Sequence, residues 1–411
     1  MVQPVEIMAP VGSPESLTAA LNAGAHAVYF GIEQLNMRAR SSTNFTLDDL
    51  EAIAERCSAA GVRTYLTLNT ILYDHDLRLM RRIIDTAKAA GITAVIASDH
   101  AAMAYAKQAG LPVHISTQAN VTNVETVAFY AAFADVMVLS RELSLSQVKH
   151  ITREIERLQI TGPSGKLIRI EIFAHGALCM AVSGKCYLSL HSHNSSANRG
   201  ACIQNCRHQY IVTDKEDGYE LEIDNDYIMS AKDLCTIDFL DKVIDAGVRI
   251  LKIEGRGRSA DYVDTTVRCY REAAEAVADG SFSPEKVEDW KARLSTVFNR
   301  GFWDGYYLGR KMGEWSNTYG SQATERKVFL GRGVKYYERA GAGEFQLETG
   351  SLRVGDTILV TGPGTGVLRH TVTELREADR SVPEVHKGSH FSVALPEKIR
   401  ASDKLYKLQP A

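Results

Sequence analysis

The stretch AAGVRTYLTLN, residues 59–69, contains the unit that decides the fold of this chain. It joins the end of an amphipathic helical pattern to a glycine, then to an apolar run, and then to a polar residue. Gly61 suits the left-handed conformation that ends a helix, and the apolar run suits a strand buried in a parallel sheet. The same order recurs at Gly91, Gly110 and Gly247, which predicts a chain built from βα units.

Eight apolar runs in the first 280 residues fit buried parallel strands. Eight such units predict an α/β fold with a closed, TIM-like (β/α)8 barrel over residues 1–280. An open, doubly wound sheet is the alternative, but no Gly-x-Gly-x-x-Gly follows the first run, so the dinucleotide fingerprint of that fold is missing. The runs are Val5–Ala9, Ala27–Gly31, Val62–Leu68, Ala94–Ala97, Val113–Thr117, Val136–Leu139, Ile168–Phe173 and Val248–Ile253.

The pattern changes after residue 280. Residues 281–325 are predicted to form a helical linker, and residues 326–411 contain short strands separated by glycine-rich turns. This spacing is typical of a small C-terminal all-β barrel domain. We expect this domain to present or recognise a substrate, and a purely stabilising role is the alternative.

The composition and charge of the chain exclude some classes of protein. The 411 residues carry a net charge of −3, which argues against a broadly basic nucleic-acid binder but leaves room for a local basic patch. No apolar run approaches the roughly 20 residues that a membrane span needs. The N-terminus lacks the layout of a secretory signal, so a cytoplasmic location is expected.

Five of the seven cysteines fall within one stretch of the chain. Four of them, Cys179, Cys186, Cys202 and Cys206, lie in a long cysteine-rich insertion after the seventh strand, residues 176–234. In a reducing compartment such a cluster indicates a metal or catalytic site rather than disulfides. Cys235, which we expect at a helix start, is a weaker candidate to replace one of the four. Isolated Cys57 and Cys269 are expected to be buried apolar residues.

The cysteine spacing leaves several kinds of site open. Zinc sites usually arise from two closely spaced pairs, and only Cys202 and Cys206 fit that habit. An iron–sulfur cluster accepts more widely spread ligands, and the glycines at 176, 184 and 200 would let backbone amides approach its sulfurs. A nucleophilic cysteine is a third interpretation, because histidines lie nearby at 175, 191, 193 and 208. The chain contains neither Gly-x-Ser-x-Gly nor His-Glu-x-x-His.

Polar residues at the ends of the predicted strands form a second set of candidates, because the active sites of such barrels lie at the carboxyl ends of the strands. The catalytic candidates are Glu171, His175 and Glu254, although Glu254 is expected to orient neighbouring cations rather than act as a base. The substrate-binding candidates are Arg38, Arg40, Gln118, Lys252 and Arg256.

Long motifs in this chain resemble peptidase family U32. The resemblance rests on EIFAHGALCMAVSGKCYLS (residues 171–189) and NRGACIQNCR (198–207), with SAKDL (230–234) and LKIEGR (251–256) further on. MAPVG (8–12) and AVYFG (27–31) extend it to the start of the chain. The C-terminal β domain also resembles the one that ends many members.

The resemblance implies oxygen-independent hydroxylation with a [4Fe–4S] cluster on Cys179, Cys186, Cys202 and Cys206. One branch, the tRNA hydroxylation proteins, makes 5-hydroxyuridine at the tRNA wobble position and depends on prephenate. Other members act on 23S rRNA or the ubiquinone ring. The quinone branch lacks a match to Cys206, and the ribosomal branch is much longer, so the tRNA branch is favoured. The inherited family name keeps a collagenase-like peptidase as the alternative.

The function that the resemblance implies predicts which ligands the protein binds. Arg38, Arg40, Lys252 and Arg256 would bind a small dicarboxylate such as prephenate, because guanidinium groups match carboxylates. The anticodon loop of tRNA would be held by a local basic patch, with its target base stacked on an aromatic side chain. Tyr187, Tyr210 and Trp303 are the aromatic candidates, although core packing explains Trp303 better. Zinc is the less favoured metal.

Overall fold

The computed structural model describes residues 4–40, 43–211, 215–216, 229–309, 313–317, 320–378 and 380–411. Parts of the predicted insertion (212–214 and 217–228) and of the predicted linker (310–312 and 318–319) lie outside the described residues.

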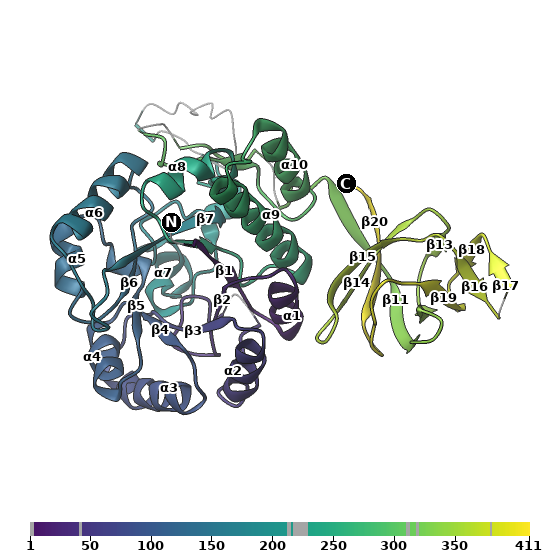
Figure 1. Ribbon diagram of the computed structural model, residues 1–411, viewed down its shortest axis with the longest axis horizontal. Helices are drawn as coiled ribbons and strands as arrows, with labels where there is room; N and C mark the ends of the chain where they lie inside the picture. The colour runs from purple at the N-terminus through teal and green to yellow at the C-terminus, as the bar shows by residue number, and fades with distance from the viewer. Residues whose placement is uncertain are drawn as a thin grey trace.

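Eight parallel strands close into a barrel, which confirms the predicted fold. Strands β1 to β7 pair in chain order, and β9 pairs with both β7 and β1, which closes the circle (Figure 1). The ends of these strands differ from the ends of the predicted runs by at most three residues. The strands are β1 Glu6–Pro10, β2 Ala27–Phe30, β3 Arg63–Leu68, β4 Ala94–Ala97, β5 Val113–Ile115, β6 Val136–Val138, β7 Arg169–Gly176 and β9 Ile250–Ile253.

Helices surround the barrel as a ring (Figure 1). Side chains cap several of them: Ser144, for example, accepts a hydrogen bond from the backbone N–H of Gln147 at the start of α6. Gly110 ends α4 with φ +74°, as the helix–glycine–strand pattern predicts. The ring helices are α1 Pro14–Asn22, α2 Leu50–Ala59, α3 Leu77–Ala89, α4 His100–Ala109, α5 Val124–Tyr130, α6 Leu145–Arg157, α8 Leu240–Asp245 and α9 Ala260–Asp279.

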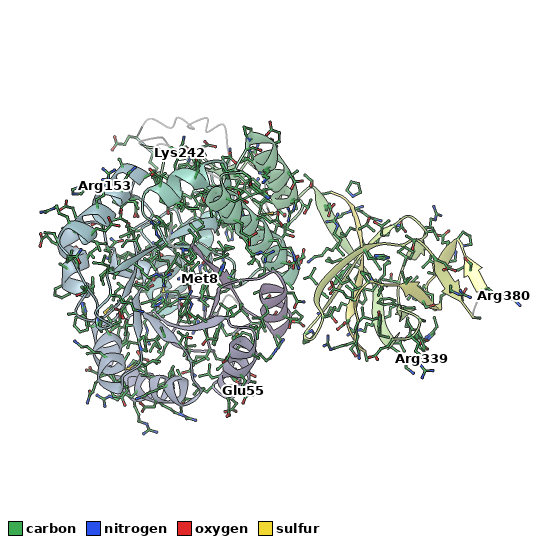
Figure 2. The ribbon with its side chains drawn as sticks, viewed as in Figure 1. Met8, Glu55, Arg153, Lys242, Arg339 and Arg380 are labelled. Carbon is green, nitrogen blue, oxygen red and sulfur yellow. The ribbon has the colours of Figure 1, made fainter. Side chains whose placement is uncertain are left out.

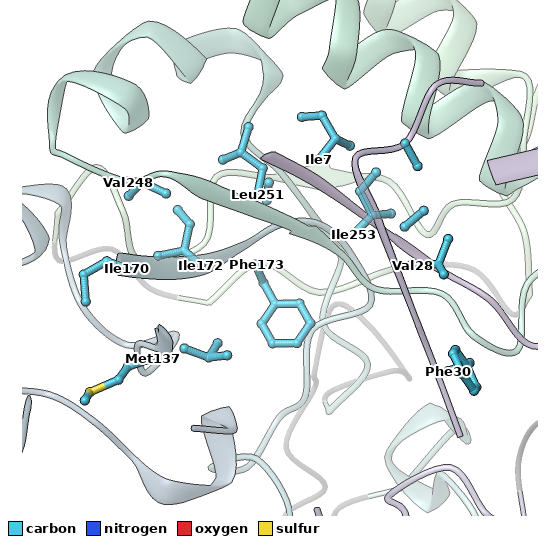
Figure 3. Packing of buried hydrophobic residues seen from close by; sticks show 14 of the residues in the cluster. Ile7, Val28, Phe30, Met137, Ile170, Ile172, Phe173, Val248, Leu251 and Ile253 are labelled. Carbon is cyan, nitrogen blue, oxygen red and sulfur yellow. The ribbon is translucent and has the colours of Figure 1, made fainter. Parts of the chain in front are cut away.

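Alternation along the strands divides the core into two layers. Met8, Tyr29 and Tyr65 belong to a cluster inside the barrel. Their neighbours, such as Ile7 and Val28, pack between the strands and the helices (Figure 3). Successive side chains of a strand point to opposite faces of the sheet, so every second residue of a barrel strand points toward the barrel axis.

The cysteine-rich insertion follows β7 as predicted. Its described part contains α7 Leu188–His193 and two short 3-10 helices, η3 Ala197–Arg199 and η4 Asn205–Arg207. It ends in β8, Asp233–Cys235, which pairs antiparallel with the end of β7. The expectation of a helix start at Cys235 is wrong, because that residue is part of this strand; the next helical turn is η5, Ile237–Phe239.

The segment after α9 contains α10, Pro284–Ser295, and β10, Phe302–Trp303. β10 pairs with β8 in parallel, so this part of the predicted linker extends the barrel sheet. The domain boundaries at residues 280 and 325 remain predictions.

The C-terminal region is all-β, as predicted. Eight of its strands form one antiparallel sheet in the order β15-β14-β20-β11-β12-β19-β16-β17, and β13 pairs with β18. The strands are β11 Glu325–Tyr337, β12 Ala342–Leu347, β13 Ser351–Arg353, β14 Thr357–Gly362, β15 Gly366–Thr371, β16 Leu375–Glu377, β17 Arg380–Val382, β18 Glu384–His386, β19 His390–Ala394 and β20 Lys404–Pro410.

The sheet lies against α1 and α9 of the barrel (Figure 1). The Thr18 hydroxyl donates to the carbonyl oxygen of Pro363 over 2.5 Å, and the Lys327 ammonium lies 2.6 Å from the Asp261 carboxylate. In Figure 2, Met8 lies near the centre of the ring, whereas exposed Glu55, Arg153 and Lys242 project from its outer helices. Among the described residues, none of the helices combines the length and apolarity that a membrane crossing requires.

Candidate active site

A cavity at the carboxyl ends of the barrel strands brings most of the predicted site residues together. The barrel contributes Arg38, Gln118, Lys252, Glu254 and Arg256 to its lining. The insertion contributes Cys179, Cys186, Cys202 and Cys206, so all four cysteines face one space although 27 positions separate the first from the last. The two sets of candidates therefore belong to one site.

The four thiols influence one another electrostatically. Burial raises the pKa of Cys206, the Arg207 guanidinium opposes this shift, and the charges of Cys179, Cys202 and Cys186 add to it. The Ser189 hydroxyl donates to the Cys202 sulfur over 4.0 Å. Within the described part of the chain, no three His, Cys, Asp or Glu side chains converge closely enough to hold a single metal ion.

Two arginines hold the insertion in place: Arg207 joins parts of the insertion to each other, and Arg199 joins the insertion to the segment after β3. Arg207 donates to the carbonyl oxygens of Leu178 over 2.7 Å and Ala231 over 2.6 Å, so it ties together segments that flank the cysteines. Arg199 forms an ion pair with Asp76 and donates to the carbonyl oxygen of Ile71 over 2.7 Å. These contacts hold an irregular segment over the mouth of the barrel.

Two glycines permit close approach of the insertion to the barrel backbone. A Cβ atom on Gly176 would lie 2.3 Å from the carbonyl oxygen of Glu254, and one on Gly200 would lie 2.1 Å from that of Asn36. Both have positive φ, +103° and +78°. The structure thus gives these glycines a packing function, whereas the predicted approach of their amides to cluster sulfurs remains a prediction.

Glu254 is held ionised by surrounding cations. Its Oε1 lies 2.7 Å from Arg38 Nη2, and its Oε2 accepts from the Tyr29 hydroxyl over 3.2 Å. Burial alone would raise the pKa of Glu254, but Arg38, Arg141 and Arg256 outweigh it and set the pKa at about 2. A carboxylate in this state orients cations, as the sequence predicts, and is a poor base at neutral pH.

Lys252 and Glu171 form a buried ion pair. Lys252 Nζ lies 2.8 Å from Glu171 Oε1 and 4.5 Å from the centre of the Tyr29 ring. Glu171 is fully buried and is not among the residues that line the cavity. Burial raises the pKa of Glu171, and the Lys252 charge opposes this shift. The contacts of Glu171 are those of a residue that positions Lys252.

Three further predicted residues lie outside the cavity lining. His175 is buried against the rings of Tyr270 and Phe302, and burial, reinforced by Arg258, lowers its pKa to about 3. Arg40 is exposed. Cys235 is buried, and its sulfur accepts a hydrogen bond from the Tyr270 hydroxyl over 3.8 Å. The structure thus brings none of these three into contact with the space between the four cysteines.

Arg141 lines the cavity but is absent from the predicted residues. Its guanidinium carbon lies 3.7 Å from the centre of the Phe173 ring, and Nη1 donates to the carbonyl oxygen of Ala177 over 3.0 Å. Arg141 follows β6 closely, so the strand-end rule that selected Lys252 would also have found it.

The cavity lining has an excess of positive charge. Glu254 is the one carboxylate among its described residues, against the cations Arg38, Arg141, Arg207, Lys252 and Arg256. Glu171 already pairs with Lys252 from outside the lining. Burial of the four arginines near one carboxylate is costly unless further anions compensate them. Thiolates or a bound anionic ligand would provide that compensation.

The three aromatic candidates for stacking on a base differ in burial and in their contacts. Trp303 is buried and packs with Leu178 and Ala231, as expected for a core residue. The Tyr210 hydroxyl donates to the carbonyl oxygen of Asn205 over 2.7 Å. Tyr187, next to Cys186, is 76% exposed and is available to a ligand outside the cavity.

Comparison with known proteins connects this site to a family. The model of peptidase family U32 matches residues 12–317. A protein of Porphyromonas gingivalis named collagenase is 58% identical over 99% of this chain and 98% of its own length. The tRNA hydroxylation protein P of Helicobacter pylori is 31% identical over 74% of this chain and 72% of its own length. That of Escherichia coli is 28% identical over 95% and 93%, respectively. The chain belongs to peptidase family U32.

Proposed function

We propose that this protein is an iron–sulfur-dependent, oxygen-independent tRNA hydroxylase that forms 5-hydroxyuridine at the wobble position, with prephenate as co-substrate. The observation that carries the proposal is the convergence of four cysteines on one cation-rich cavity at the barrel mouth. The names of the tRNA hydroxylation relatives, which match most of this chain, support the choice of substrate.

The residues present fit a [4Fe–4S] cluster. Cys179, Cys186, Cys202 and Cys206 would be its ligands, since such clusters take thiolates from spaced loop positions. The surrounding arginines and Lys252 offset the negative charge that four thiolates bring into a buried site. When bound, the cluster supplies redox or Lewis-acid chemistry, and the protein supplies binding and orientation.

The cations inside the cavity provide a binding site for a small dicarboxylate. Arg256 is buried, and burial lowers its pKa to about 10, so it stays charged at neutral pH. Its Nη1 donates to the Thr67 hydroxyl over 2.8 Å, which orients the guanidinium. Arg141, Lys252 and Arg256 would bind the carboxylates, and Glu254 keeps the Arg38 side chain in place.

Anaerobic spectroscopy of the purified protein tests the cofactor. We expect a brown protein that absorbs near 400 nm and contains about four iron and four sulfide per chain. A Cys206→Ala variant should lose most of this absorption, whereas the matched Cys57→Ala variant, far along the chain in α2, should keep it. A colourless wild-type protein with stoichiometric zinc would contradict the cluster.

Nucleoside analysis tests the substrate. In a deletion strain without a redundant homologue, we expect 5-hydroxyuridine derivatives to disappear from tRNA and to return when the wild-type gene is restored. Restoration with the Cys206→Ala gene should fail. Unchanged levels of these nucleosides in the deletion strain would remove the tRNA assignment even if the cluster is present.

A peptidase is the second candidate, favoured by the high identity to the Porphyromonas gingivalis protein named collagenase. A cysteine nucleophile needs a positioned base. His175, the nearest predicted base in sequence to Cys179, packs against Tyr270 and Phe302 instead. Hydrolysis of gelatin by the pure protein, lost in a single-cysteine variant that retains iron, would favour the peptidase over the hydroxylase.

A further inference from the structure

A second cavity lies on the other side of the segment that carries Cys179. Residues 178–183 line both cavities, so this segment is a wall between them. Thr117 and Arg141 also line both. We call the cavity with the four cysteines the inner chamber and this second one the outer chamber.

The two chambers differ in charge. The inner chamber is strongly cationic, as described above. Among its described lining residues, the outer chamber combines one cation, Arg141, with one carboxylate, Glu142. Apart from Cys179, which the proposed function makes a thiolate, its other polar groups are neutral. These include the hydroxyls of Thr117 and Ser140 and the amide of Asn120, and the Tyr306 side chain completes the lining. A chamber of this kind suits a neutral ligand with both hydrogen-bond donors and acceptors.

Hydrogen bonds to the backbone and between side chains orient the polar groups of the outer chamber. Asn120 ends η2, Thr117–Ala119, in the left-handed conformation with φ +58°, and its N–H donates to the carbonyl oxygen of Thr117 over 3.0 Å. The Ser140 hydroxyl donates to the Glu142 carboxylate. Arg141 Nε is buried without a hydrogen-bond partner, although Nη1 of the same guanidinium donates to Ala177. Arg141, which lines both cavities, therefore keeps one buried donor without a partner.

We propose that the outer chamber binds a single uracil base of the RNA, flipped out of its loop. The inference rests on the proposed function, because the RNA substrate comes from there. The Watson–Crick edge of uracil offers one N–H donor at N3 between two carbonyl acceptors. The Glu142 carboxylate only accepts, so it pairs with N3–H, while the Asn120 amide donates to O4 and the Arg141 guanidinium donates to O2. Such a base would lie across a thin wall from the cysteines.

This arrangement predicts discrimination between uracil and cytosine. N3 of cytosine is an acceptor, so it repels the Glu142 carboxylate. In the Glu142→Gln variant, the new amide can donate to N3 of cytosine or accept from N3–H of uracil. The Asn120 amide can turn its oxygen toward the N4 amino group of cytosine, so the preference should disappear. Glu125→Gln, an exposed carboxylate in the first turn of α5, is the matched control.

The test measures binding of two synthetic anticodon stem–loop RNAs by fluorescence anisotropy with anaerobically purified full-length protein. The RNAs carry uridine or cytidine at the wobble position. We expect wild type and Glu125→Gln to prefer the uridine RNA about tenfold, and Glu142→Gln to bind both RNAs with affinities within about a factor of two. Asn120→Asp, which keeps a residue that tolerates positive φ, should weaken binding of the uridine RNA.

Two results would overturn the inference in different ways. If wild type prefers the uridine RNA and Glu142→Gln keeps that preference in full, the outer chamber is not the base site, and the proposed function is untouched. If wild type binds neither RNA and the deletion strain retains its 5-hydroxyuridine, the chamber assignment fails together with the proposed function. Iron content and thermal unfolding, measured for every variant, verify that the compared proteins are folded and equally loaded.

Discussion

Glu254 is the residue on which the cation arrangement of the inner chamber depends. Replacing it by Gln leaves Arg38 with a neutral partner, and breaking a buried pair of this kind costs about 3 kcal/mol of unfolding free energy at neutral pH. The folded pKa, about 2, lies below the ordinary value of 4.5. The contribution of the carboxylate is therefore complete above about pH 4.5 and is lost as pH falls toward 2.

Urea unfolding of wild type and Glu254→Gln between pH 7 and 3 measures this contribution. The difference in unfolding free energy should be constant down to about pH 4.5 and then shrink. Glu338→Gln, which alters the exposed Lys398–Glu338 pair, is the control and should differ little from wild type. A difference between Glu254→Gln and wild type that grows on acidification would contradict the buried pair.

Two buried histidines make the whole fold sensitive to mild acid. Burial, with help from nearby cations, lowers the pKa of both His114 and His175 from 6.5 to about 3. The unfolded chain takes up protons at these positions below pH 6.5 and the folded chain does not, so stability falls with pH. Each histidine contributes on the order of 1 kcal/mol per pH unit to this loss.

A His175→Gln variant should therefore lose less unfolding free energy than wild type between pH 7.5 and 5.5. Its exposed counterpart is His75, whose side chain is 72% exposed, and His75→Gln should follow wild type across this range. Denaturant titrations at the two pH values give the comparison. Equal losses in all three proteins would show that His175 also takes up a proton in the folded state.

Sequence reasoning found the cysteines because their residue type and clustering are visible without a structure. It selected His175 because that residue lies at the end of a predicted strand, but the structure does not include His175 in the cavity lining. The register between β7 and β9 shifts between Phe173 and His175, and this bulge sends the His175 ring toward α9. No local sequence signal marked that shift. Arg141, in contrast, was predictable by position and was overlooked.

At the scale of elements, the insertion owes its position to backbone contacts as much as to side chains. Gly200 combines φ +78° with the close approach to Asn36 described above. Gly91 also has φ +78°, but nothing lies within 4 Å of a Cβ atom placed there. Ala at either position pays the same conformational cost of about 1–2 kcal/mol, and Ala at Gly200 meets the barrel backbone as well.

If the four cysteines hold the proposed cluster, Gly200→Ala should push the insertion away from the barrel mouth and lower the iron bound per chain, while Gly91→Ala should retain wild-type iron. Iron and sulfide analysis after anaerobic purification measures the effect. The thermal unfolding temperature of both variants should fall, because both carry the strain of an alanine in the left-handed region. It should fall further for Gly200→Ala, whose Cβ also meets the barrel backbone. Full iron loading of Gly200→Ala would show that the insertion can shift without disturbing its cysteines.

The barrel strands were predictable because each is a continuous apolar run after a helix-ending glycine. β8 was not, because it has only three residues, and its pairing with β7 and β10 comes from tertiary contacts. The contacts that place the insertion over the mouth, such as Arg199 with Asp76, join positions far apart in the chain, so spacing alone could not reveal them.

At the scale of the whole molecule, charge is divided unevenly. Residues 325–411 contain 14 Lys and Arg against 11 Asp and Glu, whereas the rest of the chain contains 33 against 39. The small net charge of the chain thus conceals a basic C-terminal region attached to an acidic barrel. This region docks on α1, where the Asn22 amide donates to the carbonyl oxygen of Thr365 over 3.2 Å. If the protein acts on tRNA as proposed, a basic region fixed beside the barrel would suit the binding of the tRNA body while its loop enters the barrel.

Charge reversal in the C-terminal region tests whether this region binds the body of the tRNA. Arg339, in the turn between β11 and β12, and Arg380, in β17, are exposed on the C-terminal region (Figure 2), and Arg153 and Lys242 are exposed on the barrel. If the sheet contacts tRNA phosphates, Arg339→Glu with Arg380→Glu should weaken tRNA binding several-fold and reduce the salt dependence of the dissociation constant by about one unit of log–log slope per lost contact. Arg153→Glu with Lys242→Glu changes the net charge equally and should leave that slope nearly unchanged. An equal loss of tRNA affinity in both double variants would mean that binding depends on the net charge of the protein. The C-terminal sheet would then not be a specific tRNA-binding surface.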